Sequence, residues 1–267
     1  MRSQDQTKYT TKLLDSRVLI IGGSSGLGYG LAEACLEHGA HVTISSSNPT
    51  RISSAVASLQ TSYPSATPRI RGLTADLSDP TTIEDVLTSL FNDAVAPLPG
   101  QKLDHVLFTA GDALSTLPIS SLSAPAILKA GQIRFLAPLL TAKLVARFVE
   151  PSHRSSYTIT TGSISERPMA DWSVVAAYAG GHHSMVRNLA LDLRPVRVNG
   201  VSPGVVDTGL WKVEGEERER FLEGCAEKMA TGRVGRVEDV VESFLGVLRD
   251  WNCDGSVVRT DGGALFM

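Results

Sequence analysis

A glycine-rich segment near the start of the chain has the composition of a phosphate-binding turn. It reads Gly22-Gly23-Ser24-Ser25-Gly26-Leu27-Gly28 and lies between an apolar run at residues 18–21 and a helical pattern of apolar residues. Glycine tolerates positive φ angles and lets the backbone approach a pyrophosphate, which can rest on the helix N-terminus. Taken alone, the segment also fits an ordinary glycine-rich turn. As a dinucleotide-binding loop it would contact the cofactor through Gly22, Ser24, Ser25, Gly26, Leu27 and Gly28.

The turn after the second apolar run contains the side chains that would choose between NAD and NADP. Proteins that bind NAD usually place Asp or Glu there to accept a hydrogen bond from the ribose 2′-hydroxyl. Residues 45–51 contain no acid, and their hydroxyl, amide and guanidinium groups suit the charge of a 2′-phosphate. We therefore expect NADPH or NADP⁺ as cofactor, bound through Ser46, Ser47, Asn48 and Arg51. The alternative is a solvated polar turn with Arg51 on a helix surface.

Strand and helix patterns alternate along the whole chain and must position these turns. Short apolar runs predict seven strands, at residues 18–21, 41–44, 70–74, 105–109, 157–161, 197–201 and 256–259. Long helices are expected at residues 127–148 and 173–193. This alternation predicts an α/β protein: a single-domain Rossmann fold over residues 1–267, with a doubly wound parallel seven-stranded sheet and helices on both faces. A charge-rich segment at residues 214–227 breaks the alternation, and we expect a variable substrate lid at about 207–232.

The composition of the chain excludes several classes of partner. A formal charge of −3 and the lack of any Lys/Arg run argue against a nucleic acid. The three cysteines are scattered, so we expect neither a metal site nor disulfides. Residues 1–16 lack the apolar core of a signal peptide, and no apolar run approaches the roughly 18 residues of a membrane helix. We therefore expect a cytoplasmic protein with no membrane partner.

Further motifs follow the glycine-rich turn in a characteristic order. They are Asp76-Leu77, Thr109-Ala110-Gly111, the run at residues 197–208 with its Pro203-Gly204 turn, and Asp261-Gly262-Gly263. With them the sequence resembles the short-chain dehydrogenase/reductase family over nearly its whole length, although Ile21 stands where the family usually has threonine. This resemblance implies further cofactor contacts at Asp76, Leu77, Ala110, Gly111, Pro203, Gly204, Val206 and Thr208.

The same resemblance locates the family's catalytic Asn, Ser, Tyr and Lys, and all four positions hold other residue types. In the family, Tyr donates or accepts the proton, Lys lowers the pKa of that Tyr, and Ser orients the carbonyl oxygen. The helix that carries Tyr and Lys ends in a Leu-Ala-x-Glu-Leu pattern, which is here residues 189–193. Counting back without gaps gives Val175 for Tyr, Ala179 for Lys, Gly162 for Ser and Arg134 for Asn.

Tyr178 offers an alternative alignment. A three-residue insertion would make it the family tyrosine, with His182 four residues later in place of the lysine. The gapless offsets agree with one another, however, and they leave the site without a proton donor. General acid catalysis contributes roughly 10²–10⁴-fold to carbonyl reduction. An iminium carbon becomes a neutral amine when it accepts hydride and needs no proton, so the vacant site favours a cationic C=N⁺ acceptor.

Three residues near the vacant positions are the expected substrate contacts. Asp171 could hold a cationic nitrogen, Trp172 could form an aromatic wall with cation–π capacity, and Arg134 could bind a carbonyl or amide oxygen. Each has an ordinary alternative. Asp171 could cap the helix that starts near Ser173, Trp172 could belong to the core, and Arg134 could form a structural ion pair.

Arg134 and Trp172 also make the chain similar to the fungal reductase/Diels–Alderase enzymes of bridged indole alkaloid biosynthesis, although Met169 stands where those enzymes have an acid. The first hypothesis is therefore an atypical NADPH-dependent reductase. It would deliver hydride to an iminium-like intermediate of natural-product, here indole alkaloid, biosynthesis and could also guide a Diels–Alder cyclisation. The alternatives are a redox-silent cyclase or isomerase that keeps NADP as part of its pocket, and a non-catalytic NADP-binding protein. The expected partner is a bulky hydrophobic small molecule.

Assembly is also expected from the resemblance. Members of the family commonly pair two long helices, which here span residues 127–148 and 173–193. We therefore expect a homodimer or homotetramer. Apolar surface on these helices would come from Ala137, Leu140, Leu144 and Ala190.

Overall fold

The apolar runs form the strands of one parallel sheet. The structure, a computed structural model, describes residues 6–97 and 100–267. The strands pair in the order β3-β2-β1-β4-β5-β6-β7, and every pair is parallel. Their bounds are β1 (Arg17–Ile21), β2 (His41–Ser46), β3 (Ile70–Thr74), β4 (His105–Phe108), β5 (Ser156–Thr160), β6 (Arg197–Pro203) and β7 (Val257–Thr260). The expected doubly wound Rossmann sheet is confirmed, with strand ends that differ slightly from the prediction.

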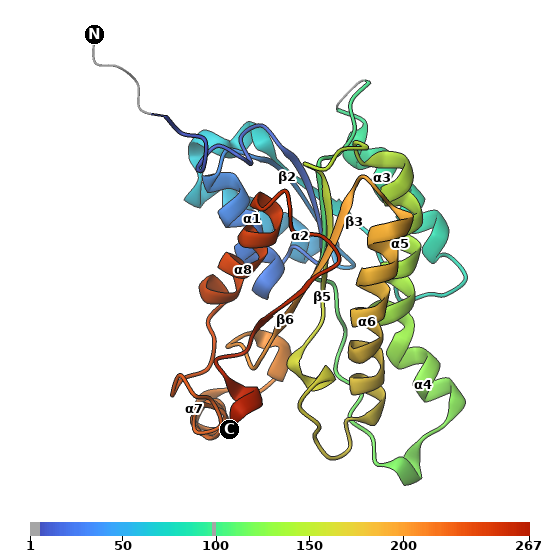
Figure 1. The fold of residues 1–267 in the computed structure, drawn as a ribbon, viewed down its shortest axis with the longest axis vertical. Helices are drawn as coiled ribbons and strands as arrows, with labels where there is room; N and C mark the ends of the chain where they lie inside the picture. The colour runs from blue at the N-terminus through green and yellow to red at the C-terminus, as the bar shows by residue number, and fades with distance from the viewer. Residues whose placement is uncertain (1–5, 98–99) are drawn as a thin grey trace.

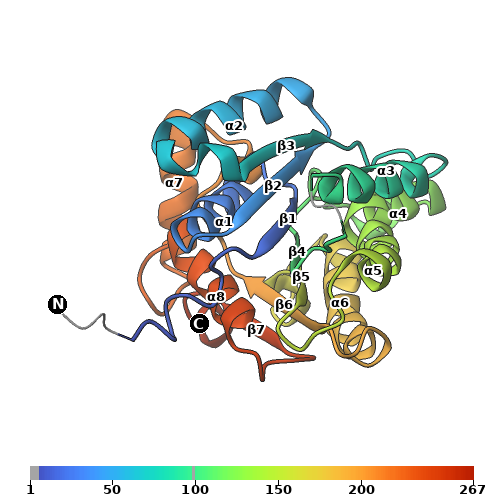
Figure 2. The same ribbon diagram turned by 90° about the horizontal axis from the view of Figure 1, so that it is seen from above.

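Helices cover both faces of the sheet, as Figures 1 and 2 show. One face carries α1 (Gly26–Glu37), α2 (Pro49–Ser62) and α8 (Val237–Arg249). The other carries α3 (Ile83–Val95), α5 (Ala137–Phe148) and α6 (Ser173–Asp192). Because the central strands β1 and β4 are buried from both sides, they contain continuous apolar stretches rather than alternating patterns.

The strand order reverses between β1 and β4. The chain first adds β2 and β3 on one side of β1, and then crosses over to place β4 to β7 on the other side. The loops that leave β1 and β4 diverge at such a point, which opens a crevice at the carboxyl ends of the strands. The glycine-rich turn follows β1, and Ala110 follows β4 closely. Two of the expected cofactor segments therefore meet at the crevice.

The long helix expected at residues 127–148 is interrupted. Its first part is α4 (Ala124–Gly131), a π-helical turn follows at Gln132–Leu136, and α5 then continues to Phe148. Single π-helical turns inside α-helices are frequent at functional sites. This turn contains Arg134, so the backbone geometry changes at one of the expected substrate contacts.

Most of the apolar residues that we expected on an oligomer surface belong to the core, so that part of the prediction is wrong. Ala137, Leu144 and Ala190 are only 0%, 3% and 7% exposed, because the helix faces that carry them pack on the sheet. Leu140 is partly buried against the same core. Outward-facing apolar side chains on these helices include Leu128, Leu139 and Leu191.

The charge-rich segment forms helix α7 (Gly215–Ala226), which has no buried residue. Its attachment includes a contact between the rings of Trp211 and Phe221, whose centroids are 5.2 Å apart, and an ion pair between Arg218 and Asp207. Within residues 6–97 and 100–267, no helix is both long enough and apolar enough to cross a membrane. Residues 1–5 of the segment expected to lack a signal peptide lie outside the described residues.

Candidate active site

The glycine-rich turn is pressed against the end of β4. A Cβ atom on Gly22, whose φ is +95°, would lie 2.4 Å from the backbone nitrogen of Ala110. A Cβ atom on Gly28 would lie 2.2 Å from the carbonyl oxygen of Gly22. No side chain fits at these separations, so both positions require glycine. The turn therefore presents bare backbone to the crevice, as close approach to a pyrophosphate requires.

Helix α1 begins with uncapped N–H groups. Its N-cap residue, Ser25, makes no side-chain hydrogen bond to the first turn, and Gly26 has a φ of +52°. Thr208, in the turn after β6, lies close by: a Cβ atom on Gly26 would be 3.6 Å from its Cγ2. Free N–H groups and the positive end of the helix dipole attract phosphate. The fold thus places Gly26 and Thr208, two of the expected cofactor contacts, next to each other.

A cavity of about 430 Å³ lies between α1 and α2, beside this turn. Its lining contains hydroxyl groups and one guanidinium but no carboxylate, and consists of Ser24, Ser25, Gly26, Tyr29, Thr50, Arg51, Ser54, Ala55 and Ser58. Such a set suits a phosphate. Tyr29, Ser54 and Ser58 are additional to the expected residues. The signal for the serines is their helical spacing from Arg51, since i, i+3 and i+7 share one helix face.

Some polar residues of the turn after β2 stabilise the local fold, and others are exposed to solvent. Asn48 caps α2, because its Oδ1 accepts a hydrogen bond from the backbone nitrogen of Arg51 at 2.9 Å. The Oγ of Ser46 lies 3.5 Å from the backbone nitrogen of Asn48. Ser47 and Arg51 are exposed, and the Arg51 guanidinium forms no ion pair within the described part of the chain. Arg51 and Ser47, whose Nη2 and Oγ lie 3.5 Å apart, are therefore the exposed groups of this turn that can meet a ligand.

Replacing Arg51 by alanine is expected to weaken NADPH binding and to leave NADH binding nearly unchanged. A hydrogen bond to a charged group contributes roughly 1.5–3 kcal/mol, which is about 10- to 150-fold in affinity. Fluorescence titration with both nucleotides checks this, with Arg187→Ala on the exposed surface of α6 as the control. Equal losses for NADPH and NADH would show that Arg51 does not contact the 2′-phosphate.

Asp76 and Leu77 follow β3 at the edge of the crevice. Asp76 is exposed, and its Oδ1 accepts a hydrogen bond from the backbone nitrogen of Ser78 at 3.0 Å. Leu77 is buried, and its carbonyl accepts from Nε2 of Gln132 at 3.1 Å. Because Gln132 begins the π-helical turn, this bond connects the end of β3 to the segment that carries Arg134.

The turn after β6 is fixed by contacts on both sides. Pro203 ends the strand, and a Cβ atom on Gly204 would lie 2.9 Å from the Cα of Asp261. Val206 is buried, and its carbonyl accepts a hydrogen bond from Nε1 of Trp211 at 2.8 Å. The side chain of Val206 is thus in the core, and it is the side chain of Thr208 that lies beside the start of helix α1.

The π-helical turn places Arg134 against the end of β4. Its Nε lies 3.1 Å from Oδ1 of Asp112, and its Nη2 donates to the Asp112 carbonyl. A Cβ atom on Gly111 would be 2.9 Å from Nη2, so the guanidinium covers this glycine. Burial lowers the pKa of Arg134, and the Asp112 carboxylate opposes that shift. The ion-pair alternative for Arg134 is thus present in the structure, with a partner that the sequence did not reveal.

His182 fastens the π-helical turn from α6. Its Nε2 lies 2.6 Å from the carbonyl oxygen of Arg134. Since a carbonyl only accepts, Nε2 carries the proton, and Nδ1 is buried without a partner among the described residues. Burial lowers the pKa of His182, which keeps the ring neutral near pH 7. His182 therefore supports the segment that carries Arg134.

The Tyr178 hydroxyl is directed to helix α4. It donates to the carbonyl oxygen of Ile127 at 2.9 Å, and its ring packs on Phe135 with centroids 5.3 Å apart. Val175 and Ala179 are both buried at 8% exposure. Ala179 meets the end of β5, because its carbonyl accepts from Oγ1 of Thr161 at 3.0 Å. Near the end of β5, α6 therefore carries aliphatic side chains, and the Tyr178 hydroxyl is hydrogen-bonded to helix α4.

Tyr178→Phe is expected to leave turnover within a few-fold of the parent. The change removes one hydrogen bond to a helix carbonyl, so it should lower the free energy of unfolding by roughly 0.5–1.5 kcal/mol. Tyr157→Phe is a matched control, because that hydroxyl also donates to a backbone carbonyl, Pro138, at 2.9 Å. A loss of turnover of about 10²-fold or more, the scale of general acid catalysis, would make Tyr178 the proton donor.

Asp171 and Trp172 lie in the loop between β5 and α6. Asp171 is exposed with a φ of +64°, and its carbonyl accepts from the backbone nitrogen of Leu117 at 2.8 Å. The N-cap of α6 is Trp172, which makes no side-chain capping bond. The Asp171 carboxylate has no partner within the described residues, so the helix-cap alternative is not observed. Trp172 is half-buried rather than part of the core.

This loop is tied to the end of the chain. Arg167 donates to the carbonyl oxygens of Lys228 at 3.2 Å and Met267 at 3.1 Å. Next to it, Glu166 lies 3.6 Å from Nη1 of Arg259. The segment that carries Asp171 and Trp172 is therefore held between α6 and the C-terminal residues.

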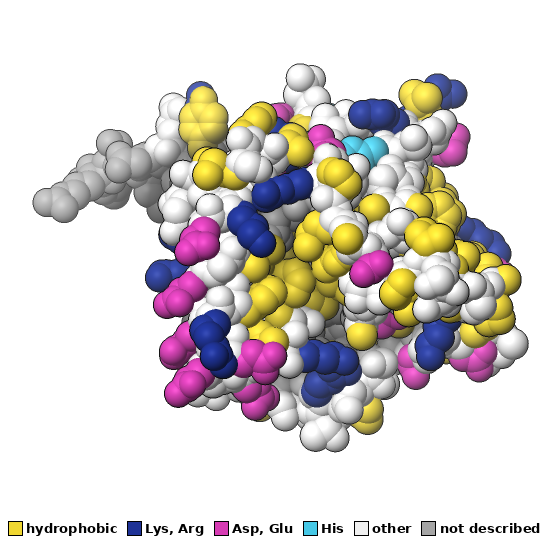
Figure 3. Space-filling model, turned by 90° about the horizontal axis from the view of Figure 1, so that it is seen from below, with side chains coloured by type: hydrophobic (Ala, Val, Ile, Leu, Met, Phe, Trp, Pro, Cys, Tyr) yellow, Lys and Arg dark blue, Asp and Glu magenta, His cyan; other side chains and the backbone are white. Residues whose placement is uncertain are grey.

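Apolar side chains gather at the end of the molecule that carries α4 and α7. Ile119, Met169 and Leu210, in the loops after β4, β5 and β6, are 68%, 56% and 42% exposed. Figure 3 views this end and shows a hollow lined with hydrophobic side chains and bordered by charged ones. Among residues 6–97 and 100–267, no group of three or more His, Cys, Asp or Glu could hold a metal ion. The surface of this hollow is therefore mainly apolar.

Comparisons with known proteins agree with this geometry. The family model for the SDR-like Rossmann domain matches residues 9–267. The chain is 42% identical over 262 residues to the short-chain dehydrogenase/reductase fsr5 of Gibberella fujikuroi, covering 97% of this chain and 98% of that relative. The solved structure of the MalC reductase/Diels–Alderase from Malbranchea aurantiaca gives a TM-score of 0.90 at 38% identity, covering 97% of this chain and 100% of that one. A short-chain dehydrogenase from Burkholderia cenocepacia in complex with NADP shares the fold, with a TM-score of 0.81 at 23% identity over 95% of this chain and 99% of that one.

Proposed function

The chain belongs to the family of SDR-like Rossmann domains, the short-chain dehydrogenases/reductases, and from this premise we propose that it is an atypical NADPH-dependent reductase of a cationic, iminium-like carbon. One observation carries the proposal. At the end of β5, helix α6 carries the aliphatic side chains of Val175 and Ala179. The Tyr178 hydroxyl donates its hydrogen bond to the carbonyl oxygen of Ile127. Neither of these two positions nor Tyr178 supplies a proton donor in the described chain, and such a site is suited to an acceptor that needs no proton.

The crevice fits a nicotinamide dinucleotide phosphate. Gly22 and Gly28 leave bare backbone where a Cβ atom would collide, and the N-cap residue of α1, Ser25, makes no side-chain hydrogen bond to the first turn. The cavity between α1 and α2 contains Arg51 and hydroxyl groups but no acid, which supports NADPH over NADH. When bound, the reduced nicotinamide would supply a hydride. The chain's own residues would hold the phosphates, position the acceptor and exclude water.

Charged residues suit the two ends of such an acceptor. Asp171 has an exposed carboxylate without a partner in the described part of the chain, and it is next to Trp172 in the sequence; charge and the aromatic face together can hold a cationic nitrogen. Arg134 is oriented by Asp112 and by the π-helical turn, so its guanidinium is fixed before any ligand arrives. Such a fixed donor suits a carbonyl or amide oxygen on the same molecule.

The exposed apolar side chains at the end of the molecule that carries α4 and α7 support a large hydrophobic substrate. The exposed side chains of Ile119, Met169 and Leu210 and the half-buried Trp172 suit a bulky hydrophobic molecule. The MalC reductase/Diels–Alderase is 38% identical over almost the whole chain. This likeness supports a reductase role in natural-product biosynthesis with a guided Diels–Alder cyclisation as a second activity. An indole alkaloid, the substrate class that the resemblance at Arg134 and Trp172 implies, is the substrate that we propose. A redox-silent cyclase that keeps NADP as a pocket wall is the competing candidate.

Asp171→Asn tests the charge that the proposal assigns. Asparagine also tolerates the positive φ at this position, so the change removes charge and keeps shape. An ion pair at ~4 Å is worth roughly 4 kcal/mol at an effective dielectric of 20, and solvent at this exposed site reduces that greatly. We expect kcat/KM for N-methyl-3,4-dihydroisoquinolinium to fall about tenfold, which is ~1.4 kcal/mol, with NADPH affinity unchanged. Undiminished iminium reduction would remove Asp171 from the site.

Assembly is proposed as a homodimer or homotetramer. Leu128, Leu139 and Leu191 are 71%, 39% and 65% exposed on α4, α5 and α6. These are the helices that members of the family commonly pair, so the exposed leucines would provide apolar contact between copies. Light scattering at micromolar concentration measures the mass directly, and a monomer would reject this assembly.

A further inference from the structure

The carbonyl oxygen of Arg134 lacks the donor that an α-helix would provide. The residue four positions later is Pro138, which has no backbone N–H, so the ordinary helical hydrogen bond to this carbonyl cannot form. Pro138 lies in the first turn of α5, directly after the π-helical turn. A backbone carbonyl inside a protein needs a hydrogen-bond partner, so a donor from outside the helix can bind here.

His182 on α6 is that donor. Its Nε2 lies 2.6 Å from the Arg134 carbonyl oxygen, and its side chain is only 4% exposed. The imidazole also stacks on the ring of Phe135, with ring centroids 6.1 Å apart and an angle of 12° between the planes. One side chain of α6 therefore contacts two consecutive residues of the π-helical turn.

Glycines let α4 and the π-helical turn approach α6 closely. A Cβ atom on Gly131 would lie 2.4 Å from Cζ of Tyr178, and a Cβ atom on Gly181 would lie 2.9 Å from Cε2 of Phe135. The ring of Phe135 packs on both Tyr178 and the imidazole of His182. Because these rings fill the space that the glycines leave, the hydrogen bond from His182 has little room to lengthen.

Arg134 is therefore held at both ends. Its guanidinium pairs with Asp112, whose side chain is 32% exposed in the loop after β4. Its backbone is held by His182, which is buried and belongs to a long helix. Water competes for the exposed ion pair but not for the buried hydrogen bond, so the buried bond restrains its partner more. The contact with His182 thus fixes the point from which the Arg134 side chain extends.

We propose that His182 is a positioning residue: by donating to the Arg134 carbonyl where Pro138 cannot, it sets the direction from which the guanidinium meets a carbonyl or amide oxygen of the substrate. This inference rests on the proposed function for the identity of the ligand and deepens it. Loss of the bond should reduce the preference for acceptors that carry such an oxygen, and should spare hydride transfer to a plain iminium carbon.

Two iminium probes test this role by kinetics. N-methyl-3,4-dihydroisoquinolinium has no oxygen for Arg134, whereas its 3-carbamoyl derivative has one, and the parent should prefer the derivative. His182→Leu should lower kcat/KM for the carbamoyl probe about tenfold or more, since a misplacement of ~1 Å can cost roughly 10²-fold. The value for the plain probe should change only a few-fold. His182→Gln can still donate to the carbonyl and should keep the preference, whereas His182→Asn, one methylene shorter, should lose it.

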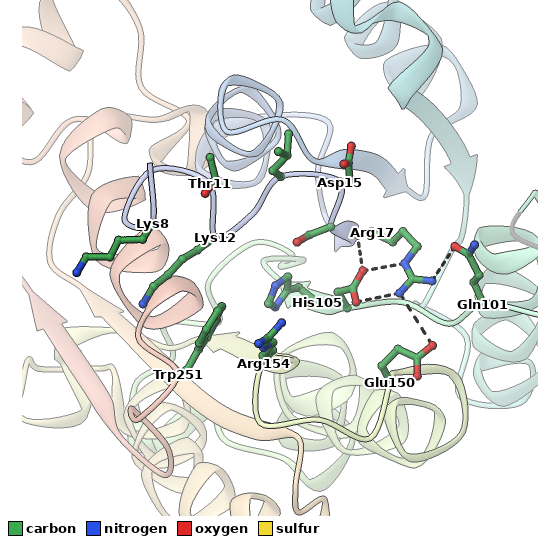
Figure 4. A pocket seen from close by; sticks show the side chains of 13 residues that line it. Lys8, Thr11, Lys12, Asp15, Arg17, Gln101, His105, Glu150, Arg154 and Trp251 are labelled. Atoms are coloured by element: carbon green, nitrogen blue, oxygen red, sulfur yellow. Dashed lines mark hydrogen bonds and ion pairs between the residues drawn. The ribbon is translucent and has the colours of Figure 1, made fainter. Parts of the chain in front are cut away.

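His105→Leu is the matched control. His105 is also buried, at 3% exposure, and its Nδ1 lies 2.9 Å from Oγ of Ser156. It begins β4, at the opposite end of the sheet from the crevice, where Figure 4 shows it among the residues that line a cavity of about 830 Å³. Its replacement should lower the melting temperature, as His182→Leu does, and leave the preference between the probes unchanged.

A second readout does not depend on turnover. In NMR spectra, the Nε–H signal of Arg134, identified by its absence in Arg134→Met, reports the pairing with Asp112. It should shift or broaden in His182→Leu and His182→Asn, and match the parent in His182→Gln and His105→Leu. A parent enzyme that reduces neither probe would contradict the proposed function and leave this comparison to decide the role of His182. An Arg134 signal, or a preference between the probes, that stays unchanged in both His182→Leu and His182→Asn would overturn that role.

Discussion

Replacing Gly28 by alanine is expected to weaken NADPH binding strongly. The new Cβ atom would lie 2.2 Å from the carbonyl oxygen of Gly22 and 2.5 Å from Oγ1 of Thr109. The first contact is with backbone, so the glycine-rich turn has to move away from β4. Overpacking of this kind costs roughly 1–3 kcal/mol, or about 5- to 150-fold if all of it is expressed as affinity. Titration with NADPH and the melting temperature measure the two effects.

Gly246→Ala is the matched control for this prediction. Gly246 is also helical, in α8, but a Cβ atom there would meet no atom within 4 Å. Alanine in a helix interior is more stable than glycine by roughly 0.5–1 kcal/mol, so this variant should melt higher and bind NADPH normally. If Gly28→Ala keeps the parent's affinity for NADPH, the turn does not cradle the cofactor as we describe.

Replacing Arg134 by methionine is expected to lower kcat/KM by about 10²-fold or more. Loss of one pre-oriented donor to a reacting substrate typically costs 10²–10³-fold. The variant also leaves the Asp112 carboxylate, which is 32% exposed, without its partner. Some stability should therefore be lost as well, although solvent reaches this pair and limits the effect. Steady-state kinetics and thermal melting separate the two losses.

A double variant distinguishes catalysis from structure at this position. Arg134→Met/Asp112→Asn removes both charges, so the stability lost in the single variant should be recovered in large part. Turnover should stay low, because the donor is still missing. Recovery of turnover together with stability would show that Arg134 acts only as the structural partner of Asp112.

The fold could be predicted because burial on both faces leaves a direct mark on the sequence. Continuous apolar runs such as residues 18–21 became β1, and the charge-rich segment became α7. The π-helical turn at Gln132–Leu136 could not be predicted, because one extra residue in a turn hardly alters helical periodicity. The prediction that Ala137 and Leu144 lie on an oligomer surface was wrong. From sequence alone, an apolar helix face that packs on the sheet cannot be distinguished from one that packs on a second copy of the chain.

The parts of the candidate site that depend on local backbone geometry could be predicted from the sequence. The contacts between side chains that are far apart in the sequence could not. Gly22 and Gly28 lie where the sequence indicates, since only glycine fits a turn that touches the next strand. The pairing of Arg134 with Asp112 joins the π-helical turn to the loop after β4. Only the tertiary structure brings them together, and the same is true of the bond between His182 and the Arg134 carbonyl.

The most direct test of the central claim compares two acceptors with the parent enzyme and NADPH. N-methyl-3,4-dihydroisoquinolinium presents a C=N⁺ bond, and α-tetralone presents a carbonyl on a similar ring system. We expect NADPH oxidation with the iminium salt, and a rate at least about 10²-fold lower with the ketone, since general acid catalysis contributes roughly that much. Comparable rates for both acceptors, with ketone reduction lost in Tyr178→Phe, would contradict the account and restore an ordinary proton-donating dehydrogenase.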